Sequence, residues 1–167
     1  GQVMDFANLF TVALGAILVN NFNYGMTGGQ RAPTTPYGAI TKTSPLGNEE
    51  HPFDMYKLVT GAGATYYARA SVTHPIQLEK AIEEGIKHKG FSFIEVLSPC
   101  PTTAGRNIFS FKTPTEMYDW YEQQVAVLKP GQTEAPDGKI GLGILYVDDT
   151  KEELCDVQAE KKEEAKK

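Results

Sequence analysis

The apolar positions of the chain fall into short blocks that predict alternating strands and helices. Residues 16–19 form a continuous apolar run, which is typical of a buried parallel strand. Aromatic and β-branched residues predict two further strands, over 64–68 and 91–97. The clearest helix lies between these two, with Pro75 at its first position and Gly90 as its stop. Strand, helix and strand at this spacing form a βαβ crossover, which implies a parallel sheet.

The polar and apolar spacing also predicts details of the helices. Residues 51–59 are expected to form a short helix, and a capping box at Thr113–Glu116 to open another that runs to about residue 128. For the central helix, Thr73 or His74 is the expected cap. Its apolar stripe is predicted to consist of Ile76, Leu78, Ile82 and Ile86.

The two ends of the chain differ in character. The apolar stretch that begins in residues 1–15 is too short to span a bilayer and lacks a signal peptide's charged start, so we expect a short helix there. Residues 140–147 are predicted as the last strand. We therefore divide the chain into one α/β domain over 1–147 and a charged tail over 148–167 that is either flexible or helical.

The composition of the chain restricts the classes of protein to which it can belong. The chain has 167 residues, 41% of them hydrophobic, and a net charge of −5, which favours a soluble globular domain without nucleic acid or membrane as a partner. Its two cysteines, Cys100 and Cys155, form neither a disulfide framework nor a complete metal motif. A reducing, cytoplasmic location is therefore the expectation.

One stretch, residues 20–36, becomes polar and conformationally permissive directly after the first strand. Gly25, Gly28 and Gly29 allow positive φ and close approach of the backbone to a ligand, and asparagine and threonine side chains crowd between them. Ligands of open α/β sheets bind outside the carboxyl ends of the strands, so this loop is a candidate cofactor cradle. On composition alone, an ordinary surface loop is an equal alternative.

The loop reads NNFNYGMTGGQRAPTTP, and two further blocks follow it in order, HPFDMYKLVTGAGATYYAR and QLEKAIEEGIKHKGFSFIEVLSPCPTTAGR. Together these blocks cover about residues 16–111. They resemble the β subunits of 2-oxoacid:ferredoxin oxidoreductases, nearest the 2-oxoglutarate type. The resemblance implies part of a thiamine-diphosphate-binding domain, with a mostly parallel sheet, flanking helices and here a charged C-terminal tail.

The resemblance also assigns ligands. It implies that Mg²⁺ is bound by the side-chain oxygen of Asn21 and the backbone carbonyl of Asn23. Oxygen ligands suit this hard ion, which bridges protein and phosphate. The family's Gly-Asp-Gly motif is not found among the twenty residues before Asn21, and Asp5 does not replace it. The residues implied to contact thiamine diphosphate are Asn20, Tyr24, Gly25, Met26, Thr27 and Gly28.

Cys100 has two interpretations. As a lone cysteine it is an inert, partly buried thiol at a strand end. The resemblance instead makes it the fourth thiolate of a [4Fe–4S] cluster in the complete protein, because it lies 79 residues after Asn21 and is flanked by prolines as in the family. Such a cluster needs four thiolates, and the family's other three come from an N-terminal region that this sequence lacks.

The implied activity is oxidative decarboxylation of a 2-oxoacid to an acyl-CoA, with electrons passed to ferredoxin and 2-oxoglutarate as the favoured substrate. The expected partners are the α subunit of the same enzyme and ferredoxin, within an oligomer. No catalytic side chain is predicted, because the histidines lie at expected helix ends. The alternative is a truncated, non-catalytic fragment or interaction module that folds and associates but binds no cofactor alone.

Overall fold

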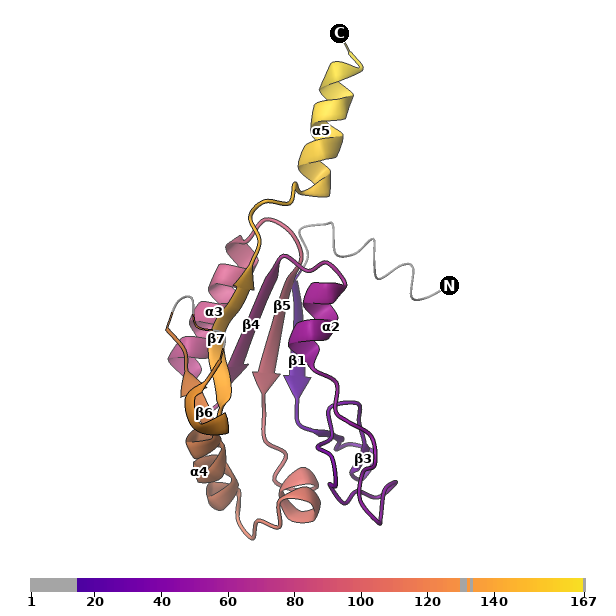
Figure 1. Ribbon diagram of the computed structural model, residues 1–167, viewed down its shortest axis with the longest axis vertical. Helices are drawn as coiled ribbons and strands as arrows, with labels where there is room; N and C mark the ends of the chain where they lie inside the picture. Colours follow the sequence, from indigo (N-terminus) through magenta and orange to yellow (C-terminus); the bar gives the residue numbers. More distant parts are fainter. Residues whose placement is uncertain (1–14, 130–131, 133, 167) are drawn as a thin grey trace.

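A mixed, mostly parallel sheet forms the centre of the molecule in the computed structural model, which describes residues 15–129, 132 and 134–166 (Figure 1). Within those residues the sheet has five strands in the order β1-β5-β4-β7-β6. Beside the sheet, β2 and β3 form a separate two-stranded ribbon. The strands are β1 (Gly15–Asn20), β2 (Asn23–Tyr24), β3 (Gln30–Arg31), β4 (Tyr66–Ser71), β5 (Ser92–Leu97), β6 (Val125–Val127) and β7 (Ile140–Val147).

Three neighbouring strands run in the same direction and end together. β5 pairs in parallel with β1 on one side and with β4 on the other, and Leu97 is in register with both Asn20 and Ser71. The arrowheads of these strands point to one end of the molecule (Figure 1). β7 then pairs antiparallel with β4, and β6 parallel with β7. The predicted α/β fold with a mostly parallel sheet is confirmed.

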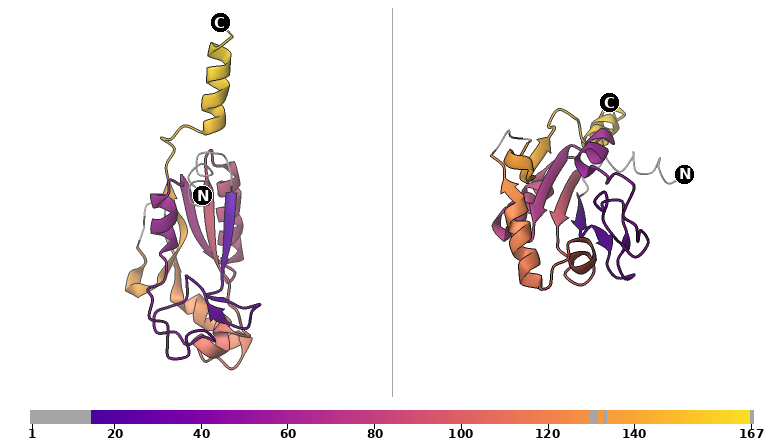
Figure 2. Two further views of the ribbon diagram at one scale, coloured as in Figure 1. Left: turned by 90° about the vertical axis from the view of Figure 1, so that its right-hand side faces the viewer. Right: turned by 60° about the horizontal axis from the view of Figure 1, so that its bottom comes forward.

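Helices cover both faces of the sheet. Helix α3 (Pro75–Lys87) packs on one face, and the shorter α2 (Met55–Gly61) lies on the other, as the left view in Figure 2 shows. In the described residues, the remaining helices are α4 (Pro114–Gln124), the π-helix η1 (Ala104–Ile108), the short 3₁₀ turn η2 (Pro136–Gly138) and α5 (Leu154–Glu164). The face that carries α2 also contains the polar residues described below.

The predicted apolar stripe of α3 was partly wrong. Leu78 and Ile82 do pack against the sheet, but Ile76 and Ile86 are 84% and 78% exposed. The inward face consists of residues 78, 81, 82 and 85, where Ala81 and Gly85 are fully buried. This set has the helical spacing i, i+3, i+4, i+7. At 3.6 residues per turn, residue 86 falls at the margin of this face and residue 76 on the opposite side of the helix.

Several element boundaries differ from the prediction for local reasons. Helix α2 begins at Met55 because the side chain of Asp54 caps it by accepting a hydrogen bond from the Lys57 amide at 3.2 Å. Helix α4 is capped by Thr113 as predicted, yet it ends at Gln124 because Val125 starts β6. His74 is the N-cap of α3 but its side chain makes no capping hydrogen bond.

Strand β1 forms as predicted, but it is not buried. It pairs only with β5 among the described residues, and Ile17 and Val19 are 53% and 61% exposed. The apolar run therefore marks a strand at the sheet's edge whose outer side is open. The helix expected over the first residues lies outside the described part of the chain.

Helix α5 forms within the charged segment after β7 and extends away from the sheet (Figure 1). The Glu153 side chain caps it by accepting from the amides of Cys155 and Asp156 at 2.9 and 3.2 Å. Lys89, which follows α3, forms an ion pair with Asp156 at 3.0 Å. In the part of the chain that the structure covers, no helix has the length and apolarity needed to cross a membrane.

Candidate functional site

The 20–36 loop leaves the sheet at the carboxyl end of β1, where open α/β sheets bind ligands. Asn21 follows the strand directly and is half-buried. Residues 23–24 and 30–31 then pair as the β2–β3 ribbon, so that the intervening turn stands at the end of the sheet. The loop thus leaves the sheet at the carboxyl end of a strand, as the sequence predicts.

Asn20 anchors the base of the loop. Its side chain is buried, and Nδ2 donates a hydrogen bond to Glu95 Oε1 on β5 at 2.8 Å. Its Oδ1 accepts from the Phe22 amide at 3.1 Å and from Thr34 Oγ1 at 2.8 Å. One amide group therefore joins the sheet to both limbs of the loop.

Glu95 is a buried carboxylate in the middle of the sheet, and its charge is compensated. Besides Asn20, it accepts hydrogen bonds from the Tyr67 hydroxyl at 2.6 Å and from Arg69 Nε at 2.7 Å. Burial and the neighbouring Glu95 charge raise the pKa of Tyr67 well above its usual value, so its hydroxyl remains a donor. A buried charge is tolerated when it is paired and hydrogen-bonded in this way.

The backbone is strained at Phe22, directly after Asn21. Phe22 has φ of 63°, which a bulky side chain rarely adopts. Its ring packs against Phe109 and Tyr121, each with a centroid distance of 6.2 Å, and its carbonyl accepts from Thr35 Oγ1 at 2.6 Å. Backbone strain held in place by surrounding contacts is concentrated at functional sites in proteins.

The tip of the loop is a glycine-dependent turn. The amide of Gly28 donates to the Gly25 carbonyl and that of Gly29 to the Tyr24 carbonyl, each at 3.0 Å, and φ is +93° at Gly28 and +89° at Gly29. Thr27 Oγ1 donates to the Tyr24 carbonyl at 3.2 Å. The side chains of Tyr24 and Met26 are exposed, so they are free to contact another molecule.

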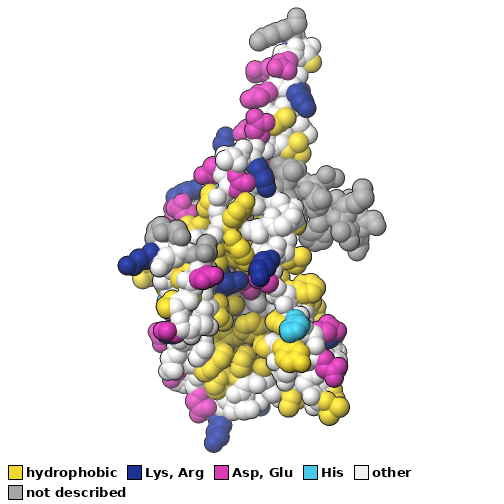
Figure 3. All heavy atoms as spheres, viewed as in Figure 1, with side chains coloured by type: hydrophobic (Ala, Val, Ile, Leu, Met, Phe, Trp, Pro, Cys, Tyr) yellow, Lys and Arg dark blue, Asp and Glu magenta, His cyan; other side chains and the backbone are white. Residues whose placement is uncertain are grey.

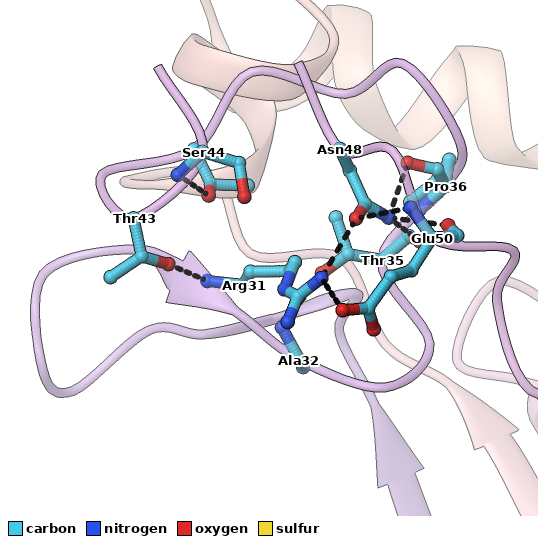
Figure 4. Close-up of polar contacts among 9 residues, drawn as sticks. Arg31, Ala32, Thr35, Pro36, Thr43, Ser44, Asn48 and Glu50 are labelled. Atoms are coloured by element: carbon cyan, nitrogen blue, oxygen red, sulfur yellow. Dashed lines mark hydrogen bonds and ion pairs between the residues drawn. The ribbon is translucent and has the colours of Figure 1, made fainter. Parts of the chain in front are cut away.

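The chain beyond the tip is organised around the buried side chain of Asn48 (Figure 4). Its Nδ2 donates to the carbonyls of Thr35, Pro36 and Glu50 at 2.9, 3.2 and 2.9 Å. Its Oδ1 accepts from Arg31 Nη1 at 3.3 Å, while the same Arg31 nitrogen pairs with Glu50 at 2.6 Å. The long loop after β3 is thus held together by hydrogen bonds and an ion pair among its own residues and Arg31.

Cys100 lies against this loop although it is 79 residues distant in sequence from Asn21. A β-carbon at Gly25 would lie 3.3 Å from Cys100 Sγ. The Thr103 hydroxyl accepts from Asn23 Nδ2 at 2.7 Å and lies 2.9 Å from the Cys100 sulfur. Burial raises the pKa of Cys100, but hydrogen bonds from Thr103, Thr102 and nearby backbone amides lower it to about 7.

One polar atom of the loop is buried without a partner, the side-chain oxygen Oδ1 of Asn23. Buried polar atoms are nearly always hydrogen-bonded, so an orphaned acceptor marks a place for a further group. The Asn21 side-chain oxygen has only a long contact, 3.4 Å, to the Asn23 amide. These amide oxygens and the permissive turn fit a hard cation with a phosphate group better than an apolar ligand.

A cavity of about 610 Å³ opens beside Asn20 on the α2 face of the sheet. Its polar lining includes Thr34, Arg69 and Glu95, and Phe22 is among the apolar residues around them. Figure 3 shows hydrophobic side chains gathered in the hollow on this face. The volume lies in the range of small-molecule sites, and the cavity adjoins the base of the loop.

The structure gathers the predicted loop residues and Cys100, whereas Cys155 lies apart on α5. Sequence reasoning missed Glu95, Asn48 and Thr103. A carboxylate inside the apolar run FSFIEVL was the available signal for Glu95, because a buried Glu requires partners. Across the described residues, no group of three or more His, Cys, Asp and Glu side chains is placed to hold a metal ion.

Comparison with known proteins gives consistent matches. Residues 8–96 match the family described as thiamine pyrophosphate enzyme, C-terminal TPP binding domain. The 2-oxoglutarate synthase subunit KorB of Methanocaldococcus jannaschii is 46% identical over 135 residues, which cover 79% of this chain and 50% of that protein. The KorB subunit of Archaeoglobus fulgidus is 57% identical over 91 residues, or 54% of this chain and 34% of that protein.

A solved structure is also similar, the 2-oxoglutarate:ferredoxin oxidoreductase from Magnetococcus marinus with 2-oxoglutarate, coenzyme A and succinyl-CoA bound. It superposes with a TM-score of 0.80 at 25% identity, covering 98% of this chain and 57% of that one. The chain spans about half the length of the first curated relatives it matches, 51% and 50%.

Proposed function

Because the chain belongs to the thiamine pyrophosphate enzymes, through their C-terminal TPP-binding domain, we propose that it acts in the β subunit of a 2-oxoacid:ferredoxin oxidoreductase. The proposed reaction converts a 2-oxoacid, with 2-oxoglutarate favoured, to an acyl-CoA and passes electrons to ferredoxin. The named similarity to 2-oxoglutarate synthase subunits supports this substrate class. The observation that carries the proposal is the preformed 20–36 loop at the carboxyl end of β1.

In this proposal the loop holds thiamine diphosphate together with Mg²⁺. Asn21 supplies a side-chain oxygen to the ion and Asn23 its backbone carbonyl. An octahedral Mg²⁺ takes further oxygens from the diphosphate, from water or from another polypeptide. The residues proposed to contact the cofactor are Asn20, Tyr24, Gly25, Met26, Thr27 and Gly28.

The protein's own part in the reaction is binding and orientation. Thiamine diphosphate, when bound, supplies the electron sink that makes decarboxylation of a 2-oxoacid feasible. Both the nitrogen and the oxygen of the Asn20 side-chain amide already make hydrogen bonds within the protein. Its contribution is therefore to fix the loop through Glu95 and Thr34. The strained Phe22 backbone sets the orientation of Asn23 relative to Asn21.

Cys100 is proposed as the fourth thiolate of a [4Fe–4S] cluster in the complete protein. Its contact with the loop supports this role, because it places the sulfur beside the proposed cofactor site. The pKa of about 7 favours the thiolate form that ligates metals. The sequence has two cysteines and a cubane cluster needs four, so other thiolates must come from elsewhere.

The proposed partners are the α subunit of the same oxidoreductase and ferredoxin, in a cytoplasmic oligomer. The open side of β1 supports association, because an edge strand presents unpaired backbone groups to another polypeptide. Exposed Ile17 and Val19 add apolar surface there. A second polypeptide on this edge would stand directly beside Asn21.

The alternative is a fragment or interaction module that folds and associates without binding cofactor by itself. The small ligand set favours it. Two asparagines supply two oxygens, and among the described residues no group of three or more His, Cys, Asp and Glu side chains is placed to hold a metal ion. The two functions differ in one property, whether the assembly of the chain with its α subunit binds thiamine diphosphate and Mg²⁺.

The enzymatic proposal is tested by reconstitution. The complete protein that contains this chain, combined with its α subunit and supplied with thiamine diphosphate and Mg²⁺, is assayed for reduction of ferredoxin that depends on both 2-oxoglutarate and coenzyme A. The expected result is activity in the wild type and its loss in Asn21→Ala. Equal activity in both proteins would rule out a role for the loop, and no reduction with any 2-oxoacid would favour the non-catalytic alternative.

A further inference from the structure

We propose that Thr103 is a positioning residue that fixes Asn23, and with it the metal-binding part of the 20–36 loop, against the turn that carries Cys100. Thr103 follows β5, immediately before η1, and lies 80 residues after Asn23 in sequence. The inference rests on the proposed function only for the identity of the ligand. The contacts themselves are properties of this chain.

The hydroxyl of Thr103 lies within hydrogen-bonding distance of two neighbours, Asn23 and Cys100. Asn23 Nδ2 is a donor only, so the Thr103 oxygen accepts this hydrogen bond, which is 2.7 Å long. The single hydroxyl proton is then available for the Cys100 sulfur at 2.9 Å. One side chain thus joins the two residues proposed to ligate Mg²⁺ and the cluster.

Thr103 also determines how closely the loop approaches. A β-carbon at Gly29 would lie 3.2 Å from Thr103 Cβ, and one at Gly25 would lie 3.5 Å from Thr103 Oγ1. The absence of side chains at these two glycines leaves the space that Thr103 occupies. The hydroxyl bond and the close packing together hold the loop in one place.

The hydrogen bond from Asn23 to Thr103 fixes which way the amide points. With Nδ2 engaged, Oδ1 is left buried and without a partner. The same bond holds the Asn23 backbone, whose carbonyl is the proposed ligand and whose amide lies 3.4 Å from Asn21 Oδ1. Residues that orient ligating groups in this way commonly tune metal affinity without touching the metal.

The first test needs no ligand. Backbone hydrogen exchange of peptides covering residues 21–31 is measured by mass spectrometry in the wild type, Thr103→Val and Thr103→Ser. Thr103→Val keeps the shape but removes the hydroxyl, and it should accelerate exchange in this segment roughly fivefold to tenfold. Thr103→Ser keeps the hydroxyl and should stay within about twofold of the wild type.

A matched control separates this effect from a general loss of stability. Ser92→Ala removes another buried hydroxyl, one that donates to the Gly85 carbonyl at 2.6 Å on the α3 face. It should leave exchange over 21–31 unchanged. Unchanged exchange in Thr103→Val, or equal acceleration in Ser92→Ala, would overturn the proposal.

A second variant tests the same hydrogen bond if Thr103→Val does not fold. Asn23→Ala removes the other end of the same hydrogen bond and should accelerate loop exchange to a similar extent. Where all variants fold, the double variant should exchange no faster than the stronger single one, because the two residues act through one contact. Fully additive effects would contradict the proposed link.

The last measurement separates this inference from the proposed function. Calorimetric titration of the chain with its α subunit, using thiamine diphosphate and Mg²⁺, should show severalfold weaker affinity in Thr103→Val and near-normal affinity in Thr103→Ser. If the wild type binds no cofactor while the exchange pattern is as expected, the proposed function fails and the positioning role stands. Binding in all variants at one affinity would instead overturn the role of Thr103.

Discussion

At the scale of single residues, a buried carboxylate holds the site together. Glu95 receives hydrogen bonds from three side chains, and through Asn20 it reaches both limbs of the 20–36 loop. Its ion pair with Arg69 is largely screened from water, with 6% and 19% of the two side chains exposed. Removing one member of such a pair leaves the other charge without compensation.

We therefore predict that Glu95→Gln destabilises the protein by about 3 kcal/mol, measured by chemical denaturation. The amide retains the size of the side chain but leaves Arg69 unpaired. Glu83→Gln is the control, because Glu83 forms a surface ion pair with Lys87 in α3 and its loss should leave the denaturation midpoint unchanged. Equal midpoints for wild type and Glu95→Gln would contradict the role assigned to the buried pair.

His88 gives a prediction about pH. Its Nε2 lies 2.8 Å from Thr65 Oγ1 and its ring packs on Tyr66; burial lowers its pKa, although Asp149 and Asp148 oppose this. Below the ordinary histidine pKa of about 6.5, the unfolded chain takes up a proton that the folded chain resists. The stabilising contribution is thus present above that pKa and lost as pH falls through the folded value.

The free energy of unfolding should accordingly decrease between pH 7 and pH 5, and by less in His88→Gln. Denaturant titrations across this interval measure both slopes. The two proteins share all other titrating groups, so their difference isolates His88. Parallel pH profiles would show that the histidine titrates alike in the folded and unfolded chains.

At the scale of elements, the sequence predicts features that depend on local signals, and it does not predict features that depend on tertiary contacts. Strand β7 follows its predicted range, and Pro75 and Thr113 start their helices as expected, because caps and periodicity are local. The open side of β1 was not evident from its apolar run, since exposure depends on which strand pairs with it. Exposed Ile76 and Ile86 show likewise that apolar content alone does not define a buried face.

In the candidate site, too, some features could be predicted from the sequence and others could not. Glycine and asparagine content located the 20–36 loop, because turn chemistry can be read along the chain. The contacts of that loop with Glu95 and Thr103 join residues 75 and 80 positions apart. Such partners are chosen by strand order and register, which one sequence does not specify.

The turn at the loop tip provides a prediction at this scale. Gly29→Ala should destabilise the protein by roughly 2 kcal/mol, because a β-carbon is unfavourable at positive φ and would crowd Thr103. Gly61→Ala in α2 is the control, since its β-carbon position has no close contact outside its own helix among the described residues, and alanine favours helix. Thermal unfolding of both variants checks the contrast, and a neutral Gly29→Ala would contradict the packing described.

At the scale of the whole molecule, the sheet brings three features to one end: the amide-rich loop after β1, the Cys100 turn after β5 and the cavity on the α2 face. The loop follows β1 directly, and among the described residues the outer edge of β1 is unpaired. The chain spans about half the length of its first curated relatives, and it carries the candidate site next to a candidate association edge. We expect the isolated chain to bind cofactor weakly or not at all, and its assembly with a partner to bind it firmly.

The most direct test is calorimetric titration of thiamine diphosphate with Mg²⁺ into the wild type and Asn21→Ala, each alone and with the α subunit. The account predicts firm binding by the assembled wild type, weak or no binding by the isolated chain, and at least a tenfold loss of affinity in Asn21→Ala. In the assembly, ligand at 100 times Kd should add about 2.7 kcal/mol of stability. Identical titrations for wild type and Asn21→Ala in the assembly would contradict it.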